Sequence, residues 1–195
     1  MTAIVDAIVL AAGSATRFGS DKRLHRIDGV SMLQRSISSV HHAARKIRVV
    51  LKSADAGQLP MLLGQFATDP RVIPLLLENP SLGMGSNLAA AVAQLSVETD
   101  VALVMLADMP YLKATTVTTL VAAAGADRIV VPVCAVHGDV RRGHPVLFGR
   151  AFFPALRELC GDNGARHILQ QQAQHCLPVT VDDEGILRDV DLPGE

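Results

Sequence analysis

The segment from Leu10 to Lys22 is rich in small residues and has the composition of a phosphate-binding turn. Small side chains let a ligand approach the backbone, whose N–H groups can surround an anion. Arg17 supplies a planar guanidinium suited to phosphate oxygens, and Lys22 a compact positive charge. The segment has no GxGxxG, and Gly13 and Gly19 are one residue too far apart for a P-loop. By spacing alone, an ordinary turn with two surface charges explains it equally well.

An acidic residue follows the most apolar run of the chain. Residues 101–106 contain no polar side chain, and Asp108 comes two residues later. Mg²⁺ is usually held by one or two carboxylates together with phosphate oxygens. The alternative is that Asp108 caps the next helix, but such a cap would lie just before Ala114, and Pro110 intervenes. A magnesium ligand is therefore the favoured interpretation.

The C-terminal acidic residues fall into two groups. Asp182, Asp183 and Glu184 are interpreted as solvated surface charges. Asp189 and Asp191 alternate along an extended segment, so both can point to the same side and reach one cation. By spacing alone, either Asp189 or Asp191 could supply a second metal ligand.

Apolar runs alternate with helical stretches, and this alternation predicts the elements that must position these residues. It indicates an α/β fold with a doubly wound, mostly parallel sheet. Ligands in such folds bind beyond the carboxyl ends of the strands, where the strand order reverses. A strand at 142–148 and a helix at 165–172 predict a small C-terminal α+β addition to the same sheet, and residues 1–195 are expected to form a single domain. The expected strands are 4–10, 47–51, 72–76, 101–106 and 129–133, and the expected helices are 31–44, 56–66, 86–95 and 114–124.

Composition excludes several classes of protein. The chain has 195 residues, a net charge of −1 and no long basic run, which argues against nucleic-acid binding. Its longest apolar block, 101–107, is far shorter than the ~20 residues that span a bilayer. The N-terminus lacks the pattern of a signal peptide, and the three cysteines are widely spaced. We expect a cytoplasmic protein that binds neither membrane nor nucleic acid.

The segment L-A-A-G-S-A-T-R-F-G-S-D-K-R-L, followed by Asp28-Gly29 and Met32-Leu33, resembles the signature of the MobA-like nucleotidyltransferases. Enzymes of that family attach a nucleotide to the molybdenum cofactor. The resemblance implies a Rossmann-like nucleotidyltransferase fold and Mg²⁺ as cofactor. L-A-D-M-P then places the metal on Asp108, and D-V-D-L-P, similar to a D-x-D-T-P element, places it on Asp191. The nucleotide-binding residues implied are Leu10, Ala11, Ala12, Gly13, Arg17 and Lys22, with Asn79, Gly83 and Ser86 from a second loop.

Two further elements resemble the cytidylyltransferase branch of the family. R-G-H-P at 142–145 and G-D-N-G-A-R at 161–166 imply that His144 and Arg166 bind the acceptor substrate. Ala11-Ala12-Gly13 also favours CTP, whereas Asp21 before Lys22 is more typical of guanylyltransferases.

The resulting hypothesis is transfer of a nucleotide from NTP, preferably CTP, to a phosphorylated acceptor such as molybdopterin, with release of pyrophosphate. Arg17, Lys22 and Asp108 would be the catalytic residues. The acceptor phosphate is largely ionised near pH 7, so no general base is required. A guanylyltransferase of the molybdenum cofactor, a sugar-phosphate nucleotidyltransferase and a non-catalytic nucleotide-binding module remain alternatives. A delivery contact with a molybdoenzyme or its chaperone is a possible partnership.

Overall fold

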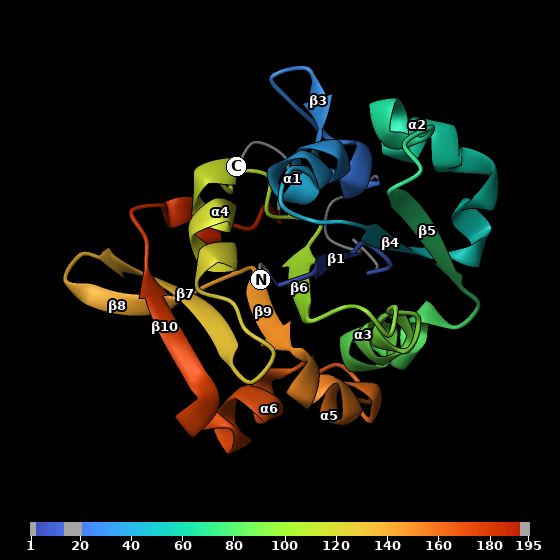
Figure 1. The fold of residues 1–195 in the computed structure, drawn as a ribbon. Coiled ribbons are helices and arrows are strands. Elements are labelled where there is room, and N and C mark those ends of the chain that lie inside the picture. Colours follow the sequence, from blue (N-terminus) through green and yellow to red (C-terminus); the bar gives the residue numbers. More distant parts are fainter. Residues whose placement is uncertain (1–2, 14–20, 192–195) are drawn as a thin grey trace.

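The computed structural model describes residues 3–13 and 21–191, and within them a mixed sheet of eight strands forms the centre of the molecule (Figure 1). The strand order is β10-β7-β9-β6-β1-β4-β5, and β8 pairs with β7. A separate antiparallel ribbon joins β2 (Arg26–Ile27) to β3 (Val30–Ser31). The strands of the sheet are β1 (Val5–Leu10), β4 (Ile47–Lys52), β5 (Val72–Leu77), β6 (Val101–Leu106), β7 (Ile129–Val136), β8 (Asp139–Arg142), β9 (Val146–Gly149) and β10 (Cys176–Thr180).

The sheet is mostly parallel. Strands β6, β1, β4 and β5 pair in parallel, as do β7 and β10, whereas β9 is antiparallel to both β6 and β7. Strand β1 pairs with β4 on one side and with β6 on the other, so the order of strands reverses between β1 and β6. Leu10 lies opposite Leu106, so both strands end at the same level. The predicted α/β class and the C-terminal addition to the same sheet are confirmed.

Helices cover both faces of the sheet (Figure 1). Alternate residues of β1 explain why both faces are apolar, since Ala7 and Val9 pack in one cluster and Ile8 in the other. Within the described part of the chain, no helix is long and apolar enough to cross a membrane. One face carries α1 (Met32–His41), α2 (Leu59–Leu63) and α4 (Ala114–Ala122); the opposite face carries α3 (Met84–Ala93), α5 (Phe153–Arg157) and α6 (Arg166–Gln171).

Two expected elements are divided in the structure. The stretch 56–66 contains only the short helix α2 between 3₁₀ turns, and Gly64, with a φ of 54°, ends it. The stretch 142–148 contains the end of β8 and most of β9, because the chain turns between them to contact a distant segment. There His144 N donates to Ile186 O at 2.8 Å, and a side chain on Gly143 would collide with that oxygen.

Asp183 is buried, so its interpretation as a solvated acid is wrong. Its Oδ2 accepts hydrogen bonds from Lys113 N at 3.0 Å and from Thr116 Oγ1 at 2.6 Å. Asp183 therefore satisfies backbone and side-chain donors at the start of α4, a capping role supplied by a residue about 70 positions away. The same contact anchors the C-terminal segment to the start of α4.

Candidate functional site

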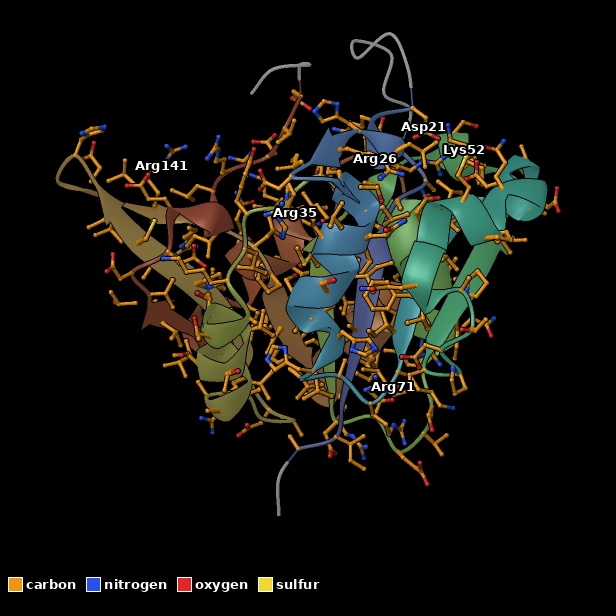
Figure 2. All side chains as sticks on the ribbon, turned by 90° about the horizontal axis from the view of Figure 1, so that it is seen from above. Asp21, Arg26, Arg35, Lys52, Arg71 and Arg141 are labelled. Carbon is orange, nitrogen blue, oxygen red and sulfur yellow. The ribbon has the colours of Figure 1, made fainter. Side chains whose placement is uncertain are left out.

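A cavity of about 660 Å³ opens at the carboxyl edge of the sheet, at the point where the strand order reverses. This is the position at which open α/β sheets bind their ligands. Lys22 and Asp108 lie in its wall, and Lys52 enters it from the end of β4. Figure 2 shows Asp21 and Lys52 at this edge and Arg71 at the opposite one. The turn after β1 contributes Leu10, Ala11, Ala12 and Gly13 to the lining, as the sequence predicts.

A lysine and two carboxylates meet at one end of the cavity. Lys22 Nζ lies 2.7 Å from Asp108 Oδ2 and 3.1 Å from Asp191 Oδ1. It also donates to Val190 O at 3.4 Å. Burial lowers the pKa of Lys22, but the hydrogen bonds and charges of the two carboxylates outweigh that effect and raise the pKa above its ordinary value. The ammonium therefore stays charged at neutral pH.

The C-terminal segment delivers only one of the two expected carboxylates to this cluster. Val190 is fully buried against Met32, and its N–H donates to Asp108 O at 3.0 Å. With Val190 held inward, Asp191 reaches Lys22. Asp189 makes no ion pair with Lys22 among the described residues. Asp191 is thus the acid of this pair that contacts the cluster, and its role as a metal ligand stays a prediction.

Asp108 has the features of a metal ligand. Its Oδ2 contacts Lys22, whereas its Oδ1 is buried and has no hydrogen-bond partner within the described residues. A buried acceptor of this kind is costly unless a ligand satisfies it. The described residues contain no group of three or more His, Cys, Asp or Glu side chains able to hold a metal. The two converging carboxylates thus fit Mg²⁺, which takes one or two carboxylates and completes its coordination with phosphate oxygens and water.

Arg23 is a residue that the sequence analysis missed. Its guanidinium pairs with Asp55 at 2.6 and 2.9 Å and with Asp21 at 2.6 and 2.8 Å, and it donates to Ala11 O at 3.2 Å. Burial lowers the pKa of Arg23, but the two carboxylates outweigh it and raise that pKa. Hydrogen bonds from Arg23 likewise hold the pKa of Asp55 below its ordinary value. Arg23 thereby joins the turn after β1 to the segment after β4.

Lys52 is a second missed residue, and the sequence did contain a signal for it. It is the last residue of β4, and the ligand-binding edge of the sheet consists of such strand ends. No comparable signal in the sequence identified Arg23, because its buried partner Asp55 lies 32 positions away on the segment after β4.

Of the three nucleotide-binding residues expected at the loop before α3, only Gly83 lines the cavity. Gly83 lines the cavity and has a φ of 103°, and a side chain there would lie 2.4 Å from the backbone of Gly161. Asn79 and Ser86 do not belong to the lining. The Ser86 hydroxyl instead donates to Leu82 O at 3.1 Å and accepts from Gly161 N at 3.2 Å. The Ser86 hydroxyl therefore links the loop before α3 to the loop that contains Gly161.

A second cavity of about 510 Å³ adjoins the first and contains both residues predicted to bind the acceptor. His144 and Arg166 line it, together with Arg142. Leu10, Leu106 and Met84 line both cavities, so the two spaces meet beyond the ends of β1 and β6. Most of the remaining lining is apolar and includes Val131, Phe148 and Leu169.

The structure also defines which ring nitrogen of His144 is available. Burial lowers the pKa of His144, an effect that Asp108, Asp189 and a hydrogen bond to the backbone of Val104 only partly oppose. Nδ1 is buried and has no hydrogen-bond partner within the described residues, so it is the ring nitrogen that a ligand in the second cavity could engage.

Arg17 lies outside the described residues, so its contact with phosphates stays a prediction.

Comparison with known proteins decides the family. The sequence pattern described as MobA-like NTP transferase domain matches residues 7–176. The chain belongs to this family. A bifunctional protein GlmU from Mycobacterium sp. strain KMS is 34% identical over 122 residues, which are 60% of this chain and 24% of that protein. The chain thus spans about a quarter of the length of the curated relatives it matches.

Solved structures share the fold of this chain. The homologue of Mycobacterium tuberculosis Rv0371c from Mycobacterium sp. strain JC1 has a TM-score of 0.81 and 25% identity, covering 96% of this chain and 90% of that one. Rv0371c of M. tuberculosis in complex with manganese has a TM-score of 0.73 and 21% identity, covering 91% and 88%. The predicted family and fold class are confirmed, and the matched residues form a domain of the nucleotidyltransferase type.

Proposed function

We propose that this MobA-like domain transfers cytidine monophosphate from CTP to the terminal phosphate of an acceptor, with molybdopterin as the expected acceptor and pyrophosphate as the other product. The observation that carries the proposal is the pair of adjoining cavities. One contains the glycine turn, Lys22, Lys52 and Asp108, with Asp191 joined to it through Lys22, and the other contains His144, Arg142 and Arg166. A nucleotide in the first and a phosphorylated acceptor in the second would bring the two reacting phosphates together near Leu10 and Leu106.

The transfer step balances without a general base. An acceptor phosphate oxygen attacks the α-phosphorus of CTP, the bond from that phosphorus to the bridging oxygen breaks, and pyrophosphate leaves. The attacking phosphate is already ionised near pH 7. The protein therefore contributes positioning and charge neutralisation. Lys22 and Arg17 would contact the triphosphate, while Arg142 and Arg166 would hold the anionic acceptor.

Asp108 and Asp191 would hold the divalent cation that this reaction requires. When bound, Mg²⁺ would offset negative charge on the triphosphate and orient it. Support comes from the buried Oδ1 of Asp108, from the convergence of both carboxylates on one ammonium, and from the manganese complex of a structural relative. Asp189 is assigned no ligand role, because it makes no ion pair with Lys22 among the described residues, whereas Asp191 does.

CTP is preferred over GTP on the basis of Ala11-Ala12-Gly13 and of the R-G-H-P and G-D-N-G-A-R elements at the second cavity. Transfer of GMP to the molybdenum cofactor and transfer to a sugar phosphate remain second candidates. We further propose that the enzyme is cytoplasmic and passes its product to a molybdoenzyme or its chaperone.

The test combines nucleotide binding with product formation. Calorimetric titration with CTP, GTP, ATP and UTP in the presence of Mg²⁺ should show the tightest binding for CTP, and molybdopterin should then stimulate pyrophosphate release. Asp108→Asn should reduce that release by at least 10²-fold, since removal of one charge-stabilising group costs about that much. Unchanged far-UV circular dichroism would show that the variant is folded. Near-normal turnover of Asp108→Asn would contradict the metal assignment, and stimulation by a sugar phosphate alone would replace the acceptor.

A further inference from the structure

The ammonium of Lys22 uses all of its hydrogen-bonding capacity on the protein itself. A lysine has three donors, and Nζ has three acceptors within reach: Asp108 Oδ2 at 2.7 Å, Asp191 Oδ1 at 3.1 Å and Val190 O at 3.4 Å. To direct its donors at a triphosphate, the ammonium has to give up some of these contacts.

The position of Lys22 also bears on cation binding. Asp108 and Asp191 are the two carboxylates that fit a divalent cation, and Lys22 already supplies their positive charge. The Lys22 and Asp108 side chains are only about one-fifth exposed, at 19% and 23%, so solvent screens their attraction less than it would on an open surface. A divalent cation that enters between these carboxylates must displace the ammonium.

We propose that Lys22 is an exchangeable counter-ion that occupies Asp108 and Asp191 until a nucleotide draws it away, so that divalent-cation binding depends on nucleotide. The proposal rests on the nucleotidyltransferase function proposed above. A bound triphosphate offers Lys22 new anionic partners, and the contacts that Lys22 made with Asp108 Oδ2 and Asp191 Oδ1 can then pass to the cation. By linkage, the cation must strengthen nucleotide binding by the same factor.

This exchange has a consequence for an enzyme that handles reactive phosphates. A cation without nucleotide competes with Lys22 for the carboxylates and binds weakly. When both ligands are present, the nucleotide gains Lys22 as a partner and the cation gains the carboxylates that Lys22 releases. The active arrangement is therefore assembled only when both ligands are present.

The test is binding of Mn²⁺ alone, measured by the loss of its free electron paramagnetic resonance signal in the absence of nucleotide. Lys22→Met removes the competing ammonium and should tighten Mn²⁺ binding by about fivefold relative to the natural protein. Lys52→Met is the matched control, because it removes one positive charge from the same cavity but from a side chain without an ion pair to either carboxylate among the described residues. It should tighten Mn²⁺ binding much less.

The proposal is overturned if Lys22→Met binds Mn²⁺ no more tightly than Lys52→Met does. Lys22→Gln provides a second variant that keeps polarity, and circular dichroism with thermal melting reports whether each variant is folded. Mn²⁺ should raise the melting temperature of Lys22→Met more than that of the natural protein, because a ligand that binds the folded state stabilises it. These measurements need no turnover, so they remain decisive even if CTP or molybdopterin proves to be the wrong substrate.

Discussion

Replacement of Arg23 by methionine is expected to destabilise the protein by about 3 kcal/mol, because a buried carboxylate would lose its counter-ion. Among the described residues, the Arg23 guanidinium makes five hydrogen bonds, to Asp55, Asp21 and Ala11. The Asp55 side chain is only 7% exposed, whereas that of Asp21 is 31% exposed. Asp55 would keep a backbone hydrogen bond from Lys52 N at 3.0 Å, which does not neutralise its charge.

The magnitude follows from the difference between these two carboxylates. Loss of one partner from a buried pair costs about 3–5 kcal/mol, whereas a pair open to solvent contributes about 0–1 kcal/mol. Only the Asp55 pair is well buried, and its remaining backbone bond places the expected loss near the lower limit. Because Arg23 also holds Ala11 O, Arg23→Met should raise the KM for nucleotide more than it lowers kcat.

Urea unfolding followed by far-UV circular dichroism measures the free energy of unfolding for each variant. Arg23→Lys is the charge-matched control: it keeps the positive charge but cannot form the fork, so its loss should be smaller. Asp55→Asn removes the charge that needs neutralisation, so the double variant Arg23→Met/Asp55→Asn should lose about 1–3 kcal/mol less than the two single losses combined. A loss below about 1 kcal/mol for Arg23→Met, or strict additivity in the double variant, would refute the reasoning.

Two further predictions concern residues away from the cavity. Asp183→Ala should lower the free energy of unfolding by about 2–3 kcal/mol in the same urea assay, because Lys113 N and Thr116 Oγ1 lose their buried acceptor. Thr116→Val removes only one of these hydrogen bonds and should lower the free energy of unfolding by about 1 kcal/mol. Equal losses for the two variants would argue against a capping role for Asp183. Asp6 is fully buried, and although burial raises its pKa, hydrogen bonds from Arg45 and Thr99 bring that pKa below the ordinary 3.8. The unfolded chain therefore takes up this proton at a higher pH than the folded chain does, so the stability that the Asp6 carboxylate confers is present above pH 3.8 and is lost as the pH falls below it. Asp6→Asn should be less stable than the natural protein at pH 7, and unfolding measured at a series of pH values should show the difference narrowing below pH 3.8; a constant difference would contradict the assignment.

The types of residue that line the main cavity could be predicted from the sequence, because the apolar runs identify the strands and the residues that follow each run can be read directly. Apolar runs such as 101–106 identify buried parallel strands, and the carboxyl ends of such strands meet at one edge of the sheet. Small residues after β1 and an acid after β6 therefore had to lie near one another. The structure places Gly13 and Asp108 in the lining of one cavity.

Other parts of the site depend on contacts between segments far apart in the chain. Asp183 resembles its acidic neighbours in sequence, and only the docking of its segment on α4 buries it. Asp189 and Asp191 are equivalent by spacing, but of the two only Asp191 forms an ion pair with Lys22 among the described residues.

The sequence by itself determined the family, the class of fold and the chemical character of the main cavity, because apolar periodicity and the residues that follow each strand are local properties of the chain. Only the tertiary structure decided which charges pair. Lys22 meets residues 86 and 169 positions away, and Arg23 meets one 32 positions away. Pairing depends on distances of a few ångströms between segments, and those distances exist only once the sheet and its C-terminal segment have packed together.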